Sequence, residues 1–154
     1  MIASADRSRL FEIEEFLSAR GWLLSERQGT REWHGSYSRN GKGLSVNSTA
    51  GTGDIVTQLG NRRVVAEFKG GPLVKKHGSH EYRILKEALG QALLWNGDAS
   101  DLVIVAVPDT QWFRSIAESW RQRPLVRRVG IQIALASESG NVWGVDPQVS
   151  ARVK

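Results

Sequence analysis

The 154-residue chain contains no cysteine. This absence excludes a disulfide framework, a thiolate zinc site and a cysteine nucleophile. The chain also lacks any apolar run near the roughly 18 residues that a membrane-spanning helix needs. Its first residues, Met1 to Arg7, contain no hydrophobic signal-peptide core. We therefore expect a cytoplasmic protein with no membrane partner.

Internal repeats, low-complexity tracts and long linkers are absent as well. The composition, 40% hydrophobic and 24% charged, is typical of a soluble globular domain. A chain of this length is long enough to bury one sizeable core. We therefore expect a single domain over residues 1–154.

The charge balance is basic. Lysine and arginine number 21 against 16 aspartate and glutamate, which gives a net charge of +5. Such an excess favours polyanion partners, because each phosphate that is neutralised releases counterions. The charge alone does not prove that the chain binds nucleic acid.

Hydrophobic periodicity and turn residues predict an α/β fold, with a mixed central sheet flanked by helices. We expect helices over residues 7–20, 80–96 and 110–122, the last with Asp109 as its N-cap. Strands are expected in the pieces 33–38 and 44–46, then over residues 54–59, 62–69, 102–107, 130–136 and 141–145. The run 102–107 is apolar throughout, which is typical of a strand covered on both faces. Trp22, Trp95 and Trp143 are expected in the core.

The clearest local feature is a hairpin around the turn pair Gly60-Asn61. Alternation along its second strand places Val64, Ala66 and Phe68 on one face, and Val65, Glu67 and Lys69 on the other. We expect Lys69 to lie among polar groups, away from the face that carries Phe68.

Charged residues gather at one end of this hairpin. Asp54 opens the first strand, and Glu67 follows after twelve intervening residues, near the end of the second. Two carboxylates that converge across the ladder repel each other unless a hard cation lies between them, and Mg²⁺ commonly takes one or two protein carboxylates. Lys69 lies on the same face as Glu67, where its amino group can orient or deprotonate a metal-bound water, or stabilise charge that develops on a phosphate. The alternative interpretation is a solvated strand end with an ordinary Glu–Lys surface pair.

A glutamine interrupts the apolar stripe of the helix that follows. Ile84, Ala88, Gln91 and Trp95 fall on one side of this helix. A glutamine in such a stripe is costly unless it is hydrogen-bonded. Gln91 therefore either serves a site or caps a backbone group at the edge of the core.

Gly53-Asp54 together with Glu67-Phe68-Lys69 resembles the signature of the PD-(D/E)xK, or restriction-endonuclease-like, nuclease superfamily. A glycine stands where the signature has proline. Gln91 to Trp95 resembles the Q-x-x-x-Y motif of one branch, with tryptophan in place of tyrosine. Glu12, nine residues before Gly21-Trp22, matches a glutamate often found in the first helix of this superfamily.

The resemblance implies a restriction-endonuclease-like core and Mg²⁺-dependent hydrolysis of DNA, typically with 5′-phosphate ends; Mn²⁺ is expected to substitute. Asp54, Glu67 and the carbonyl of Phe68 would hold the ion, Glu12 would bind a second ion or its water, Lys69 would be the catalytic lysine, and Gln91 would hold a water or a phosphate. For Glu12 the alternative is a surface helix carboxylate.

Lys75, Lys76 and Arg83 border this region and are expected to contact the nucleic-acid backbone. RNA is not excluded as a substrate, and the small size is compatible with a homodimer or with a partner protein that supplies targeting. The rival interpretation is a non-catalytic nucleic-acid-binding or assembly module. Such a module would be expected to lack a ligand or Lys69, and this chain has all of them.

Overall fold

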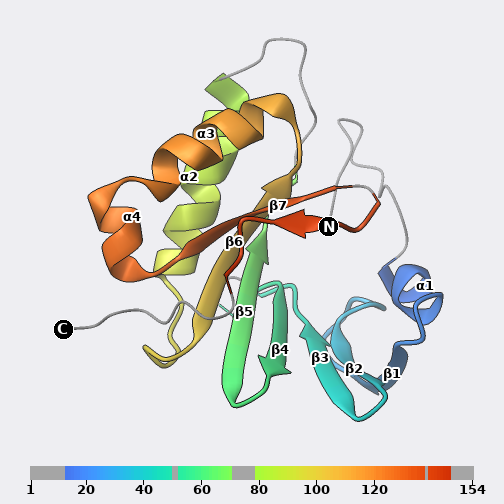
Figure 1. Cartoon of the computed structure of the whole chain (residues 1–154). Coiled ribbons are helices and arrows are strands. Elements are labelled where there is room, and N and C mark those ends of the chain that lie inside the picture. Colours follow the sequence, from blue (N-terminus) through green and yellow to red (C-terminus); the bar gives the residue numbers. More distant parts are fainter. Residues whose placement is uncertain (1–12, 50–51, 71–78, 138, 147–154) are drawn as a thin grey trace.

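The computed structural model describes residues 13–49, 52–70, 79–137 and 139–146. The fold is mixed α/β and is built on one eight-stranded sheet, in which the strands lie side by side in chain order (Figure 1). The strands are β1 (Leu23–Arg27), β2 (Gly35–Arg39), β3 (Lys42–Val46), β4 (Ile55–Leu59), β5 (Arg62–Phe68), β6 (Leu102–Pro108), β7 (Gln132–Ala136) and β8 (Val142–Trp143). The helices are α1 (Ile13–Ser18), α2 (Ser79–Leu93), α3 (Gln111–Arg121) and α4 (Pro124–Val129).

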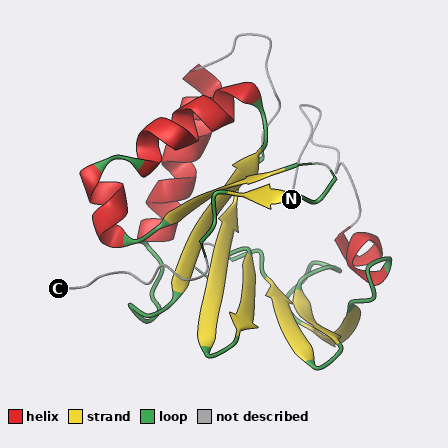
Figure 2. Cartoon of the chain, viewed as in Figure 1, coloured by secondary structure: helices red, strands yellow, loops and turns green. Residues whose placement is uncertain are grey.

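The sheet changes character at β5. Strands β1 to β5 form an antiparallel meander, β5, β6 and β7 are parallel, and β8 returns antiparallel. Parallel neighbours require crossover connections, and α2 and α3 supply them. Both helices lie on the same side of the sheet, with α4 beside them (Figure 2). Strand β5 therefore joins the open meander to the helix-covered half.

Each half has its own hydrophobic cluster. The larger one lies between α2, α3 and strands β6 and β7, and includes Leu85, Val105, Phe113 and Ile133, all fully buried. The smaller one packs α1 against the first strands around Trp33 and Tyr37. The Tyr37 hydroxyl donates to the Trp33 carbonyl at 2.7 Å, which satisfies that buried hydroxyl.

The hairpin is present as the sequence predicts. Strands β4 and β5 pair from Ile55 opposite Ala66 to Leu59 opposite Arg62, with Gly60 at φ +60° in the turn. The predicted alternation is confirmed, because Val65 and Glu67 are buried whereas Val64, Ala66 and Phe68 are only half-buried. Helix α2 covers the Val65/Glu67 face, so Glu67 and Lys69 project from the helix-covered side.

Several local predictions need correction. The N-cap of α3 is Thr110, whose side chain accepts from the Phe113 amide, whereas Asp109 pairs with Arg114. Trp143 is 45% exposed, because β8 is a two-residue edge strand and cannot bury it. Strand β6, by contrast, has no exposed residue, as predicted: Val105 and Val107 are buried on one face and Leu102 on the other.

Helix α4 and strand β1 were not expected. Of the predicted first helix, residues 7–12 lie outside the described residues. Within the described part of the chain, no helix is long and apolar enough to cross a membrane.

Candidate active site

A tight turn places Asp54 at the end of β5. Gly53, at φ +73°, is buried and precedes Asp54. Asn47 holds this turn from two sides, since its backbone N–H donates to the Asp54 carbonyl at 2.9 Å and its side chain donates to the Gly53 carbonyl at 3.0 Å. The Phe68 backbone N–H then donates to Asp54 Oδ2 at 2.8 Å. The aspartate carboxylate is thus fixed against the last residue of β5.

Glu67 and Lys69 meet on the neighbouring face of that strand end. Lys69 Nζ lies 3.0 Å from Glu67 Oε1. The Glu67 side chain is 9% exposed and the Lys69 side chain 29%. The pair is therefore a partly buried ion pair and not a solvated surface pair.

Burial raises the pKa of the Glu67 carboxyl above its usual value, because the charged form loses water. The hydrogen bond from Lys69 works in the opposite direction, and the negative charge of Asp54 raises the pKa further.

Helix α2 contributes Gln91, the fourth side chain of the candidate site after Asp54, Glu67 and Lys69. Glu67, Gln91, Trp95 and Gly53 line one small cavity of about 10 Å³, close to the space that a single water molecule needs. Gln91 Oε1 is buried there with no hydrogen-bond partner in the described part of the chain. A buried amide oxygen beside a buried carboxylate can accept a hydrogen bond from a water or a ligand in this cavity.

Asp101 was missed by the sequence analysis. It is buried, and its Oδ2 accepts from Trp95 Nε1 at 3.0 Å and from the Asp98 amide at 3.1 Å. The ring of Trp95, over which Arg63 stacks at 4.9 Å, is thereby fixed as a wall of the cavity. The signal in the sequence was a carboxylate directly before an apolar strand, where it costs free energy unless it is paired.

Asp54, Glu67, Phe68, Lys69 and Gln91 are thus brought together. Arg83 is not among them by any described contact, because it bonds to His80 and lies 3.8 Å from Glu87 along α2. Glu12, Lys75 and Lys76 lie outside the described residues.

Among the described residues, no group of three or more histidine, aspartate or glutamate side chains gathers in a way that would hold a metal ion. Asp54 and Glu67 supply two carboxylates. Hard divalent cations such as Mg²⁺ often take one or two carboxylates and keep several waters, so this donor set fits Mg²⁺ better than a cation that needs an all-protein cage. The buried carboxyl of Glu67 fits the same ion, since a cation would compensate its negative charge.

No protein-family model, curated protein or solved structure matches this chain.

Proposed function

We propose that the chain is a Mg²⁺-dependent nuclease that hydrolyses DNA phosphodiester bonds on a restriction-endonuclease-like core. One observation carries the proposal: a carboxylate pair and a lysine meet at one strand end, beside a cavity with an orphaned glutamine oxygen. A purely structural site would not be expected to keep both a partly buried charge and an unpaired amide.

Asp54 and Glu67 would hold the ion, with the Phe68 carbonyl beside them. When bound, Mg²⁺ would supply charge that polarises the phosphoryl oxygens and lowers the pKa of water. Glu12 stays a prediction as a ligand of a second ion or its water.

Lys69 and Gln91 act on the attacking water and on the phosphate. Lys69 orients the attacking water and stabilises the negative charge that builds on the phosphate. Gln91 holds a water or a phosphate oxygen through its amide. Water adds to phosphorus, the bond to the 3′ oxygen breaks, and the products are a 3′-hydroxyl and a 5′-phosphate.

The decisive experiment is cleavage of plasmid, linear, single-stranded and branched DNA with Mg²⁺, Mn²⁺ or EDTA, followed by single-turnover rates for Lys69→Ala. Losing one such electrostatic contact typically slows the chemical step about 10²- to 10³-fold. We expect that loss, with DNA binding only modestly weakened. Asp54→Asn should also abolish cleavage, but raised metal concentration should partly rescue Asp54→Asn and not Lys69→Ala.

Lys42→Ala is the matched control, because Lys42 is an exposed lysine at the far hairpin of the meander. Wild-type protein that binds DNA yet cuts no substrate, or Lys69→Ala that cuts as fast as wild type, would overturn the proposal in favour of a non-catalytic binding module.

A further inference from the structure

The helical layer has an outer surface on which aromatic and basic side chains are joined in one row. Tyr82 of α2 meets Trp120 of α3 edge to face, with ring centroids 4.9 Å apart. Lys86 lies one turn after Tyr82 on α2, on the same side. Arg123 lies one turn after Trp120, and its amide donates to the Trp120 carbonyl at 2.9 Å. The row therefore runs from Lys86 through two rings to Arg123.

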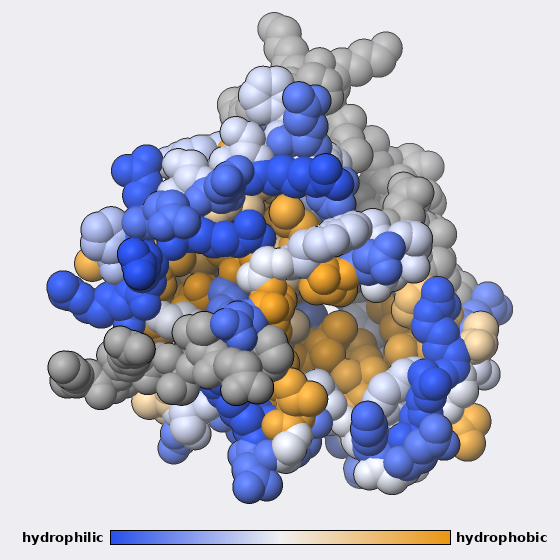
Figure 3. Space-filling model, viewed as in Figure 1, coloured by the Kyte–Doolittle hydropathy of each residue, from blue (hydrophilic) through white to orange (hydrophobic). Residues whose placement is uncertain are grey.

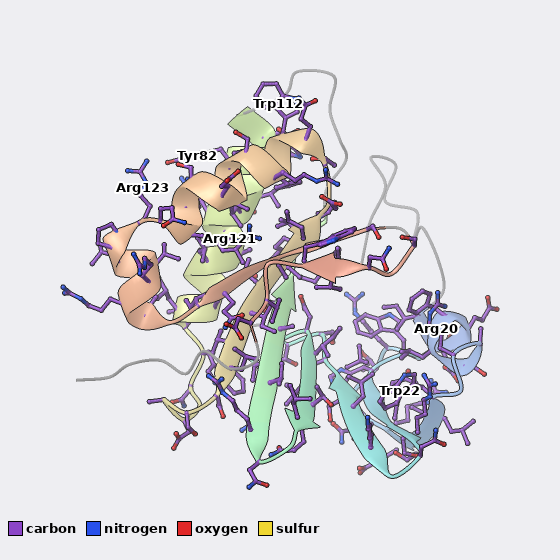
Figure 4. The ribbon with its side chains drawn as sticks, viewed as in Figure 1. Arg20, Trp22, Tyr82, Trp112, Arg121 and Arg123 are labelled. Carbon is purple, nitrogen blue, oxygen red and sulfur yellow. The ribbon has the colours of Figure 1, made fainter. Side chains whose placement is uncertain are left out.

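Trp120 is half-buried and packs against the larger hydrophobic cluster, whereas the rings of Tyr82 and Trp112 are accessible. Tyr82 is 51% exposed, and Trp112, two turns before Trp120 on α3, is 45% exposed. Figure 4 shows Trp112, Tyr82 and Arg123 along the outer rim of the helices, whereas Arg121 points inward. Arg121 donates to the Ile133 carbonyl of β7, so it belongs to the structure and not to the row.

Positive charge is concentrated beside these rings. Residues 111–129 contain five arginines and one glutamate. Arg114 is neutralised by Asp109. By contrast, Lys86, Arg123, Arg127 and Arg128 form no ion pair with the described residues. Figure 3 shows hydrophilic side chains spread over α3 and α4.

We propose that this aromatic–basic surface (Tyr82, Lys86, Trp112, Trp120 and Arg123) binds a single-stranded segment of nucleic acid. Exposed rings stack on unpaired bases, and unpaired cations beside them contact phosphates. Bases inside a duplex are already stacked on one another, so the rings would add nothing to duplex binding. This inference depends on the proposed nuclease function in one respect only, which is the choice of DNA as the nucleic acid.

The test is fluorescence anisotropy of a labelled oligothymidylate and of a duplex of equal length, in EDTA, so that cleavage is not involved. Tyr82→Ala should weaken binding of the single strand about 5- to 150-fold, the range expected for one stacked base. Tyr82→Phe keeps the ring and should bind within about twofold of wild type. Duplex affinity should be the same for all three proteins.

The basic residues have a separate readout. Lys86→Ala combined with Arg123→Ala should reduce the slope of log K against log salt by about 1.4, since each phosphate contact on a single strand contributes about 0.7. Lys42→Ala, far from the surface, should leave the slope unchanged. If Tyr82→Ala lowers the melting temperature, Trp112→Ala repeats the stacking test at the exposed ring of α3.

Equal binding of the single strand by wild type, Tyr82→Ala and Trp112→Ala would overturn the proposal. So would a variant that loses as much affinity for the duplex as for the single strand, or a wild-type protein that does not bind the single strand. These outcomes are distinct from failure of the nuclease proposal. Wild-type protein that cuts DNA while Tyr82→Ala binds normally refutes only the surface. Ring-dependent binding without cleavage by any preparation refutes only the nuclease.

Discussion

Gly53 determines where the Asp54 carboxylate lies. Its φ of +73° is a left-handed conformation, and a Cβ there would meet Val65 Cγ1 at 2.4 Å. Both facts require glycine at this position and exclude proline, whose φ is fixed at about −65°. We expect Gly53→Ala to lower stability by about 2–4 kcal/mol, from backbone strain and the clash together, and to lower cleavage by displacing Asp54.

Gly60→Ala is the matched control for this substitution. Gly60 has φ +60°, and a Cβ there would meet no atom within 4 Å. It should cost only the backbone strain, about 1–2 kcal/mol, and leave cleavage intact. Chemical denaturation of both variants measures the difference, and equal losses of stability would contradict the role of Val65.

The burial of Glu67 predicts how the stability of the protein depends on pH. Its pKa is raised by burial, so the native state disfavours the charged form and loses stability as pH rises from the ordinary value of 4.5 through the raised value. Glu67→Gln removes that cost. In EDTA the variant should match wild type in melting temperature near pH 4 and exceed it at pH 7.

A gain of stability from a substitution at a buried position is unusual. Substitutions at buried positions commonly cost about 0.5–3 kcal/mol. Thermal melts from pH 4 to pH 8, paired with cleavage assays, should find Glu67→Gln more stable at pH 7 and inactive. A variant less stable than wild type at pH 7 would show that the ion pair with Lys69 outweighs the desolvation of Glu67.

At the scale of elements, α2 serves both the core and the candidate site. Leu85 and Ala88 pack into the larger hydrophobic cluster, whereas Gln91 places an unpaired oxygen in the cavity beside Glu67. Leaving such a group unsatisfied costs about 1–3 kcal/mol. We expect Gln91→Met, which keeps the volume, to stabilise the protein by up to that amount and to slow cleavage at least tenfold.

Urea denaturation and single-turnover cleavage test this expectation together. Gln58→Met, at an exposed position of β4, is the control and should change neither quantity. A loss of stability in Gln91→Met would indicate that the amide caps the backbone, which is the structural alternative to a role in the site.

At the scale of the whole molecule, the proposed nuclease function predicts that the distribution of charge sets the path of duplex DNA. Lys75 and Lys76 lie outside the described residues, but they follow Lys69 closely in the chain. Replacing both by alanine should reduce the salt dependence of duplex binding, measured as log K against log salt, by up to about two, roughly one unit per phosphate contact. An unchanged slope would place the duplex elsewhere, with Arg127 and Arg128 the next residues to replace.

Local patterns determined much of this protein. Two-residue alternation and the Gly60-Asn61 turn specify the β4–β5 hairpin, and apolar periodicity specifies α2 and α3, because these elements depend on neighbours in the chain. The same alternation puts Glu67 and Lys69 on one face, and their contact at 3.0 Å follows from that register.

Only the tertiary structure decided which face of β5 is buried. Alternation separates two faces but does not say which one a helix will cover, and the crossover through α2 selects the side of Glu67. The bond from Phe68 to Asp54 and the row from Tyr82 to Arg123 join residues distant in sequence. Such contacts arise from chain packing, which no local pattern encodes.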